Sequence, residues 1–306
     1  MSEVSENIAS LVGIEAAHGV FRAVRISPDG NTEQSSARSF SPGGDTLSRL
    51  IDFLGGLNRE LGDFGRAGIA VPGLLDLDSK RIAFSAHFPE FSQIDIVGEI
   101  KSALGLDVVM ENDANAAALG EFTFGAGRGC SNLFYATIGA GVGGALILNK
   151  AVWRGDSGFA GEFGYFAINS DGMRLEEMAS SANIVRRTRD RFHQDNTSSL
   201  NDLDEESISI SDIVSAAEAE DDFSKLMLER TGIYVGTAVA SVINLLNIER
   251  IIIGGETVDK KGIILNAIIK RARELSFAPS FKRTQILRGT LGKNAAAIGA
   301  ALLTQQ

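Results

Sequence analysis

The 306-residue chain contains few residues of the kinds that cross-link or rigidify a protein. Its single cysteine, Cys130, excludes an intrachain disulfide and a multi-cysteine zinc site, which fits a reducing compartment. Only 5 prolines accompany 34 glycines, a balance typical of tight loops between regular elements and not of a proline-rich disordered chain. The composition therefore predicts a globular protein.

Long apolar runs are also missing. Residues 1–9 lack the basic flank and apolar core of a signal peptide, and no run approaches the about 18–20 apolar residues needed to cross a bilayer. We therefore expect a cytoplasmic protein with no membrane partner.

Positive charge is scarce, since 39 acidic residues outnumber 29 basic ones and give a net charge of -10. The negative electrostatic potential of such a protein repels the phosphate backbone of nucleic acids. The densest basic group, residues 260–273, falls on an expected helix and is typical of a solvated face. We expect no nucleic-acid partner.

The order of apolar segments predicts an α/β fold. Alternating residues predict a hairpin of strands 11–15 and 20–26. We expect a helix at residues 45–54, strands at 68–71 and 81–84, a helix at 94–104, a strand at 108–110 and a helix at 114–122. The plan restarts after residues 125–129 with strands 133–138 and 145–148, followed by helices at 174–191, 210–219 and 222–246, a strand at 250–253, a further helix, a strand at 285–287 and a helix at 295–303. This repetition predicts an architectural duplication and two lobes.

A glycine loop joins the strands of the second hairpin. Gly139 to Gly144 matches G-x-G-x-x-G, but a dinucleotide site requires a helix directly after the loop, and residues 145–148 are typical of a strand. The backbone of such a loop can approach an anion without obstruction by Cβ atoms. The pattern leaves open a phosphate-binding loop or a merely tight turn.

Asn112 and Asp113 fall where an expected strand ends and an expected helix begins. Ligand groups of α/β folds lie at such junctions. An ionised Asp113 there can deprotonate a ligand hydroxyl, while Asn112 binds the same hydroxyl. The two residues can equally serve as a helix cap, and the tripeptide alone leaves both readings open.

The segment from Glu111 to Ala117, with Gly120-Glu121, resembles the catalytic segment of the ROK family of sugar kinases and sugar-responsive repressors. Other segments resemble the family in the same order: residues 71–73, 158–164, 175–180, 246–255, 291–292 and 298–300. The resemblance spans nearly the whole chain. It implies a two-lobed, actin-like or hexokinase-like α/β architecture, a duplicated ribonuclease H-like fold with a cleft between the lobes. We expect an N-terminal lobe over 1–122, with the last helix, about 293–306, packing back on it, and a C-terminal lobe over 123–292.

The resemblance also implies residue roles. Asp113 is expected to be the base that deprotonates the sugar hydroxyl. The residues expected at the sugar are Gly73, His87, Asn112, Glu162, Tyr165 and Glu176. Those expected at the nucleotide are Gly139, Ala140, Gly141, Gly254 and Gly255. The resemblance implies ATP, Mg²⁺ carried by the nucleotide, and a homodimer. His87, Glu162 and Glu176 also have a purely structural interpretation, in which His87 is a surface residue and the two glutamates are capping or surface acids.

Two departures from the family bear on function. Tyr165 replaces a histidine and residues 169–174 replace a cysteine-rich zinc loop, so no structural zinc is expected and hydrogen bonds or packing must replace it. Glu15-Ala16-Ala17-His18-Gly19 stands where the family has D-x-G-G-T, and Ala140 stands where it has threonine. The added Cβ atoms would crowd a γ-phosphate or force a different loop path.

Two functions stay open. The first is ATP-dependent phosphorylation of a sugar or amino sugar. The alternative is a catalytically inactive sugar-binding regulatory protein on a kinase scaffold. A DNA-binding repressor is disfavoured, since repressors of the family carry an additional N-terminal helix-turn-helix and this chain begins its first expected strand near Leu11.

Overall fold

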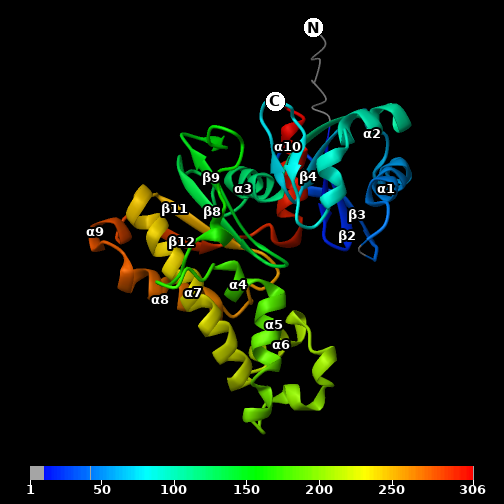
Figure 1. Cartoon of the computed structure of the whole chain (residues 1–306). Coiled ribbons are helices and arrows are strands. Elements are labelled where there is room, and N and C mark those ends of the chain that lie inside the picture. The colour runs from blue at the N-terminus through cyan, green and yellow to red at the C-terminus, as the bar shows by residue number, and fades with distance from the viewer. Residues whose placement is uncertain (1–9, 42, 306) are drawn as a thin grey trace. The chain divides into compact units, whose positions relative to one another are not determined.

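The computed structural model describes residues 10–41 and 43–305, which divide into two compact units (Figure 1). The first unit contains the described residues up to Arg128 together with Arg154–Ala160 and the chain from Lys293 onward. The second contains Gly129–Trp153 and Gly161–Gly292. The predicted lobe boundary between residues 122 and 123 stays a prediction.

The first unit is built on a five-stranded sheet of order β3-β2-β1-β4-β7. Its strands β1 (Leu11–Ala17), β2 (Val20–Ile26) and β3 (Thr32–Ser39) are antiparallel neighbours, whereas β4 (Arg66–Val71) and β7 (Asp107–Asn112) run parallel to β1. The sequence did not predict β3 because nearly all of its side chains are exposed, so no apolar alternation marks it.

The second unit repeats this plan with the sheet order β10-β9-β8-β11-β12. Strands β8 (Leu133–Ile138), β9 (Val142–Leu148) and β10 (Ala151–Trp153) are antiparallel neighbours, and β11 (Arg250–Gly254) and β12 (Gln285–Arg288) run parallel to β8. The two sheets therefore share strand order and direction. This confirms the architectural duplication that the sequence predicted.

Four longer helices belong to the first unit: α1 (Thr46–Leu61), α2 (Ile96–Leu104), α3 (Asp113–Thr123) and α10 (Ala295–Leu303). Asp45 caps α1 as predicted, because its side chain accepts a hydrogen bond from the N–H of Ser48 at 2.9 Å. The buried apolar faces of α1 and α2 form one core with β1 and β4. The short strands β5 (Leu74–Leu75) and β6 (Ile82–Phe84) and the 3₁₀ turn η1 (Pro89–Gln93) connect β4 to α2.

Every residue of α10 is buried. Figure 1 shows this helix, in red, beside β4. A Cβ atom on Gly13 in β1 or on Gly68 in β4 would lie 1.9 Å or 1.7 Å from a carbonyl oxygen of α10. A Cβ atom on Gly299, within α10, would lie 1.6 Å from the carbonyl oxygen of Ala116 in α3. Glycine at these positions therefore lets α10 touch the backbones of β1, β4 and α3 directly.

The helices of the second unit are α4 (Glu176–Ala179), α5 (Ser181–Arg189), α6 (Ile210–Glu218), α7 (Asp222–Leu246), α8 (Ile263–Leu275) and α9 (Ala278–Phe281). The predicted single helix over 174–191 is two helices, because Ser180 adopts an extended backbone conformation between α4 and α5. Buried faces of α7 and α8 pack with β8 and β11 in one core. Of the described part of the chain, only α7 has the length and apolar composition of a membrane span, and 61% of its most apolar window is buried inside the structure.

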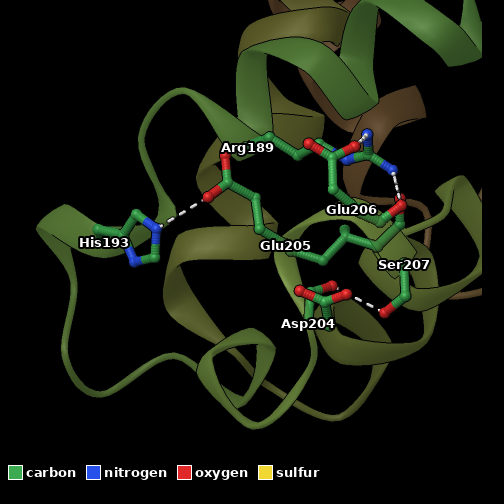
Figure 2. A network of polar contacts seen from close by, with 7 residues as sticks. Arg189, His193, Asp204, Glu205, Glu206 and Ser207 are labelled. Carbon is green, nitrogen blue, oxygen red and sulfur yellow. Dashed lines mark hydrogen bonds and ion pairs between the residues drawn. The ribbon is translucent and has the colours of Figure 1, made fainter.

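The polar segment that follows α5 contains three 3₁₀ turns, η3 (Phe192–Gln194), η4 (Ser199–Asp202) and η5 (Glu205–Ser207). Figure 2 shows Arg189 holding this segment, since its guanidinium donates to the carbonyl oxygen of Glu206 at 2.6 Å and to its carboxylate at 3.2 Å. His193 pairs with Glu205 at 3.1 Å. The segment is largely exposed as predicted, and these hydrogen bonds hold it in an ordered conformation.

We expect Gly299→Ala to lower the free energy of unfolding by about 3 kcal/mol, because an added methyl group must push α10 away from α3. Denaturant unfolding would measure the change. Gly65→Ala is the matched control, since nothing lies within 4 Å of its added Cβ atom, and it should shift stability by less than about 0.5 kcal/mol. Equal stability of the two variants would contradict the close packing of α10.

Candidate active site

Candidate site residues lie where the parallel strands of each sheet end. In the first sheet, Gly73 follows β4, and Asn112 and Asp113 join β7 to α3. In the second sheet, Gly139 follows β8 and Gly254 ends β11. Open α/β sheets bind ligands beyond the carboxyl ends of their strands. Each unit therefore presents its candidate residues at the edge where chemistry is expected.

Asn112 is the N-cap of α3, which confirms the capping role that the sequence allowed for it. Its Oδ1 accepts a hydrogen bond from the N–H of Asn115 at 3.0 Å. Its Nδ2 donates to the carbonyl oxygen of Gly73 at 2.9 Å and to Oδ1 of Asp113 at 3.2 Å. Asn112 thus links Gly73, which is also predicted to contact the sugar, to the predicted base Asp113.

Asp113 is the first residue of α3 and is half-buried. Its Oδ1 accepts from the N–H of Ala114 at 2.9 Å, in addition to the amide of Asn112. These two hydrogen bonds orient the carboxylate at the start of the helix. A base at this position is therefore held in place by the junction of β7 and α3.

Glu111 supports this junction, and the sequence analysis assigned it no role. Its side chain is 4% exposed and forms an ion pair with Arg154, whose Nε lies 2.9 Å from Oε2. Its Oε1 accepts from the N–H of Asn112 at 2.9 Å and from Nδ2 of Asn115 at 3.1 Å. A glutamate at the end of a buried strand needs such partners, which is the signal that could have identified it.

Gly73 and His87 lie in a small hairpin region after β4. Gly73 has φ +146°, and a Cβ atom on it would lie 2.6 Å from the carbonyl oxygen of Phe84. Buried Ser85 donates to the carbonyl oxygen of Pro72 at 2.6 Å, which ties the segment carrying His87 to the segment carrying Gly73. The structure therefore brings Gly73, Asn112 and the His87 segment together around the end of β4.

The segment at the position of the family's first phosphate loop forms a tight β-turn. Ala17 pairs with Val20, which leaves only His18 and Gly19 in the turn, and Gly19 has φ +78°. The imidazole of His18 lies 5.1 Å from that of His87, measured between ring centroids. Whether the added Cβ atoms crowd a phosphate or redirect the loop relative to the family stays a prediction.

Glu15 lies in β1 next to this turn, directly across from Arg22 in β2. The two side chains form an ion pair at 3.1 Å, and that of Glu15 is 16% exposed. Burial raises the pKa of Glu15, and the attraction and hydrogen bond of Arg22 offset only part of this effect. The acid at this position is therefore already partnered within its own sheet.

The glycine loop of the second unit is shorter than predicted. Strand β9 begins at Val142, so the turn contains only Gly139, Ala140 and Gly141. The N–H of Gly139 donates to the carbonyl oxygen of Gly141 at 2.9 Å, and the N–H of Val142 donates to Oε2 of Glu176 at 2.9 Å. Gly143 and Gly144 were not predicted to lie in the strand because they carry no apolar side chain, yet both pair with β8.

Glu162 and Glu176 lie close enough to interact. Burial raises the pKa of Glu162, and the charge of Glu176 raises it further. Gly161 and Gly164 flank Glu162, and Cβ atoms on them would lie 2.3 Å and 2.4 Å from carbonyl oxygens of Gly144 and Val142. Close packing of these glycines on the start of β9 therefore positions Glu162 and Glu176 beside the glycine turn.

Hydrogen bonds close the segment that replaces the family's zinc loop. The Oδ1 of Asn169 accepts from the N–H groups of Asp171 and Met173 at 3.1 Å and 3.0 Å. The guanidinium of Arg174 lies 4.4 Å from the ring centroid of Tyr165, whose side chain is exposed. Over residues 10–41 and 43–305, no three His, Cys, Asp or Glu side chains are grouped to hold a metal ion.

Gly254 and Gly255 have a packing explanation of their own. A Cβ atom on Gly254 would lie 2.2 Å from the hydroxyl oxygen of Tyr135, and one on Gly255 would lie 2.2 Å from the carbonyl oxygen of Ile138. Gly255 also has φ +101°. Both positions require glycine because the end of β11 lies against β8, which leaves an exposed backbone at the strand's end.

Ser181 and Glu256 are two further residues at the glycine turn that the sequence analysis did not select. The N–H of Ser181 donates to the carbonyl oxygen of Gly139 at 2.7 Å, and its hydroxyl donates to Oε1 of Glu256 at 2.8 Å. Glu256 directly follows Gly255 in the predicted nucleotide segment. An acidic residue directly after these two glycines was the sequence signal that could have identified Glu256 as a site residue.

Comparison with known proteins decides the family. The sequence model of the protein family described as "ROK family" matches residues 13–306 of this chain. The chain belongs to the ROK family. Similarity to individual proteins agrees: the chain is 32% identical over 265 residues to a glucokinase of Halalkalibacterium halodurans, covering 83% of this chain and 80% of that protein.

Both functional branches of the ROK family are similar to the chain. A xylose repressor of Bacillus spizizenii is 31% identical over 240 residues, which cover 76% of this chain and 59% of the repressor. The crystal structure of a ROK family glucokinase from Streptomyces griseus in complex with glucose and AMPPNP superposes with a TM-score of 0.88 at 25% identity, covering 97% of this chain and all of that one. This likeness confirms the duplicated actin-like or hexokinase-like α/β fold.

We expect Glu111→Ala to destabilise the protein by about 3–5 kcal/mol, since it removes the buried partner of Arg154, Asn112 and Asn115. Asp107→Ala, also in β7, breaks an exposed ion pair with Lys101 and should cost less than about 1 kcal/mol. Denaturant unfolding of both variants compares them. A similar small cost for Glu111→Ala would contradict a supporting role for its carboxylate.

Glu162→Gln should raise the melting temperature at about pH 8 and leave it unchanged at about pH 4. The pKa of Glu162 is raised above its ordinary 4.5 in the folded state, so the destabilising charge is absent below that pH and appears as pH rises through the raised pKa. Thermal unfolding across this pH range measures the difference. Glu229→Gln, on the exposed face of α7, is the control, and an equal pH response in both variants would refute the assignment.

Proposed function

We propose that the chain is an ATP-dependent kinase of a sugar or amino sugar, with Asp113 as the general base. The observation that carries this proposal is the junction of β7 and α3, where Asn112 and the N–H of Ala114 orient the carboxylate of Asp113. Membership of the ROK family and similarity to a glucokinase support the same activity.

In this reaction Asp113 accepts the proton of a sugar hydroxyl as the hydroxyl oxygen attacks the γ-phosphorus of ATP. The new O–P bond forms while the bond between the γ-phosphorus and the bridging oxygen breaks, so ADP carries away the negative charge. Phosphoryl transfer depends mainly on alignment and on neutralisation of phosphate charge, and a positioned base contributes about 10²–10⁴ in rate. Asn112 acts on the sugar and also positions the base.

The proposed acceptor residues are Gly73, His87, Asn112, Glu162, Tyr165 and Glu176. Several hydroxyls of one sugar can donate to carboxylates and accept from amides, which favours one stereoisomer over another. Because Oε2 of Glu176 already accepts from the N–H of Val142, its other oxygen is the one offered to a sugar hydroxyl. His87, whose imidazole lies 5.1 Å from that of His18 between ring centroids, is the residue that would set an atypical preference.

The proposed donor residues are Gly139, Ala140, Gly141, Gly254 and Gly255. The N–H of Gly139 is engaged within the turn and that of Val142 by Glu176, so a phosphate there would meet the amides of Ala140 and Gly141. The backbone of half-buried Gly254 and exposed Gly255 would lie against the flat face of adenosine. Mg²⁺ would arrive on the nucleotide and neutralise part of its charge.

A second candidate function is sugar binding without catalysis. Two features of the first hairpin favour it: the tight turn at His18 and Gly19, and the ion pair of Glu15 with Arg22. Both are formed within the hairpin and need no bound phosphate. A phosphate at this turn would compete with interactions that the sheet already satisfies. Sugar-induced stabilisation without ATP turnover would identify this function.

We also infer a cytoplasmic homodimer that binds neither nucleic acid nor membranes. The net charge of -10 supports the absence of nucleic-acid binding, because it opposes approach to a phosphate backbone. The single cysteine supports a reducing compartment.

We expect sugar-dependent conversion of ATP to ADP when the purified protein is tested against hexoses and N-acetylhexosamines. Asp113→Asn should lower kcat by about 10²–10⁴, since the amide cannot take the proton. Asp107→Asn, at the start of the strand β7 that leads to Asp113, should keep full activity. If no sugar elicits turnover while sugars still raise the melting temperature, the kinase proposal fails and the binding function stands.

A further inference from the structure

We propose that Glu256 sets the affinity for the phosphate donor by placing an uncompensated negative charge at the glycine turn after β8. This inference rests on the proposed function, because it assumes that the turn receives the phosphates of a nucleotide. It assigns Glu256 a specificity role: the residue disfavours ligands in proportion to their negative charge.

The first argument is the position of the side chain. A Cβ atom built on Gly139 would lie 3.6 Å from Cγ and 3.8 Å from Oε1 of Glu256, and no other residue provides its nearest neighbours. Glu256 therefore lies over the face of Gly139 that lacks a side chain. That face is the one a glycine leaves open for a phosphate.

The second argument is that the carboxylate is held there. Ser181, which is 8% exposed, donates its hydroxyl to Oε1 of Glu256 at 2.8 Å and its N–H to the carbonyl oxygen of Gly139 at 2.7 Å. The backbone beside Glu256 is fixed as well, because the N–H of Thr257 donates to the carbonyl oxygen of Ile138 at 3.2 Å. One buried serine thus joins the acid to the turn.

The third argument is electrostatic. Within residues 10–41 and 43–305, Glu256 takes part in no ion pair, whereas Glu15 at the corresponding hairpin of the first sheet is paired with Arg22. Glu176 adds a second carboxylate at the other end of the same turn, where it holds the N–H of Val142. Neither carboxylate has an ion-pair partner among the described residues, so both repel a polyphosphate, and Glu256 is the one that does not hold the N–H of Val142.

The repulsion must grow with ligand charge, because a Coulomb term is proportional to the charge of each partner. Adenosine carries no charge and is unaffected. Magnesium reduces the charge of ATP, so Glu256 makes the site favour the magnesium complex over free ATP. A merely structural effect of Glu256 would change all these affinities alike.

The test compares wild-type protein with Glu256→Gln, which keeps the size and the acceptor for Ser181 but removes the charge. Calorimetric titration with adenosine, ADP, MgATP and magnesium-free ATP gives a dissociation constant for each ligand. We expect no change for adenosine, a several-fold tightening for MgATP, and about tenfold or more for free ATP, with the gain reduced by added salt. Glu256→Gly should give the same order, and Glu229→Gln should change nothing.

Unchanged affinities in Glu256→Gln, or a weakening that includes adenosine, would overturn the proposal. Sugar-dependent turnover in the same samples separates this failure from that of the proposed function. Wild-type turnover with no charge-graded gain leaves the kinase and removes the role of Glu256. A charge-graded gain without turnover in any sample retains Glu256 and removes the kinase, whereas absence of nucleotide binding in every sample removes both.

Discussion

The close backbone contact of α10 with β1, β4 and α3 is the constraint on which the first unit depends. Gly13, Gly68 and Gly299 permit it, because any side chain at these positions would overlap a backbone atom. The contact fixes α3 against the sheet at the level of the main chain. Since Asn112 and Asp113 begin α3, the position of the candidate base follows from the packing of a helix that comes from the end of the sequence.

Partnered and unpartnered acids distinguish the two halves of the duplicated fold. In the first sheet, Arg22 balances Glu15 beside the hairpin turn and Arg154 balances buried Glu111. In the second sheet, the hairpin turn lies beside the carboxylates of Glu176 and Glu256, which accept from the N–H of Val142 and the hydroxyl of Ser181 and form no ion pair with any described residue. The same strand order therefore supports one turn whose acid is balanced by an arginine and one turn with unbalanced negative charge, and the second is open to a ligand that brings its own cation.

Much of the fold could be predicted from the sequence because apolar periodicity and glycine punctuation are local signals. The two hairpins, the parallel strands β4, β7 and β11, and the buried helix α10 all follow such signals. Strand β3 could not be predicted, since its side chains face solvent and only pairing with β2 defines it. The start of β9 was missed for a related reason: glycines have no apolar side chain to mark the strand.

The sequence by itself determined the family, the duplicated architecture, and the candidate residues Asn112 and Asp113 in the segment that resembles the ROK catalytic motif. Tertiary structure alone decided that Glu111 supports this segment through Arg154, that Gly254 and Gly255 are required by packing, and that Ser181 brings Glu256 to Gly139. The physical reason is distance along the chain. Motifs and periodicity are properties of neighbouring residues, whereas ion pairs, steric limits and shared hydrogen bonds join residues that only folding brings together.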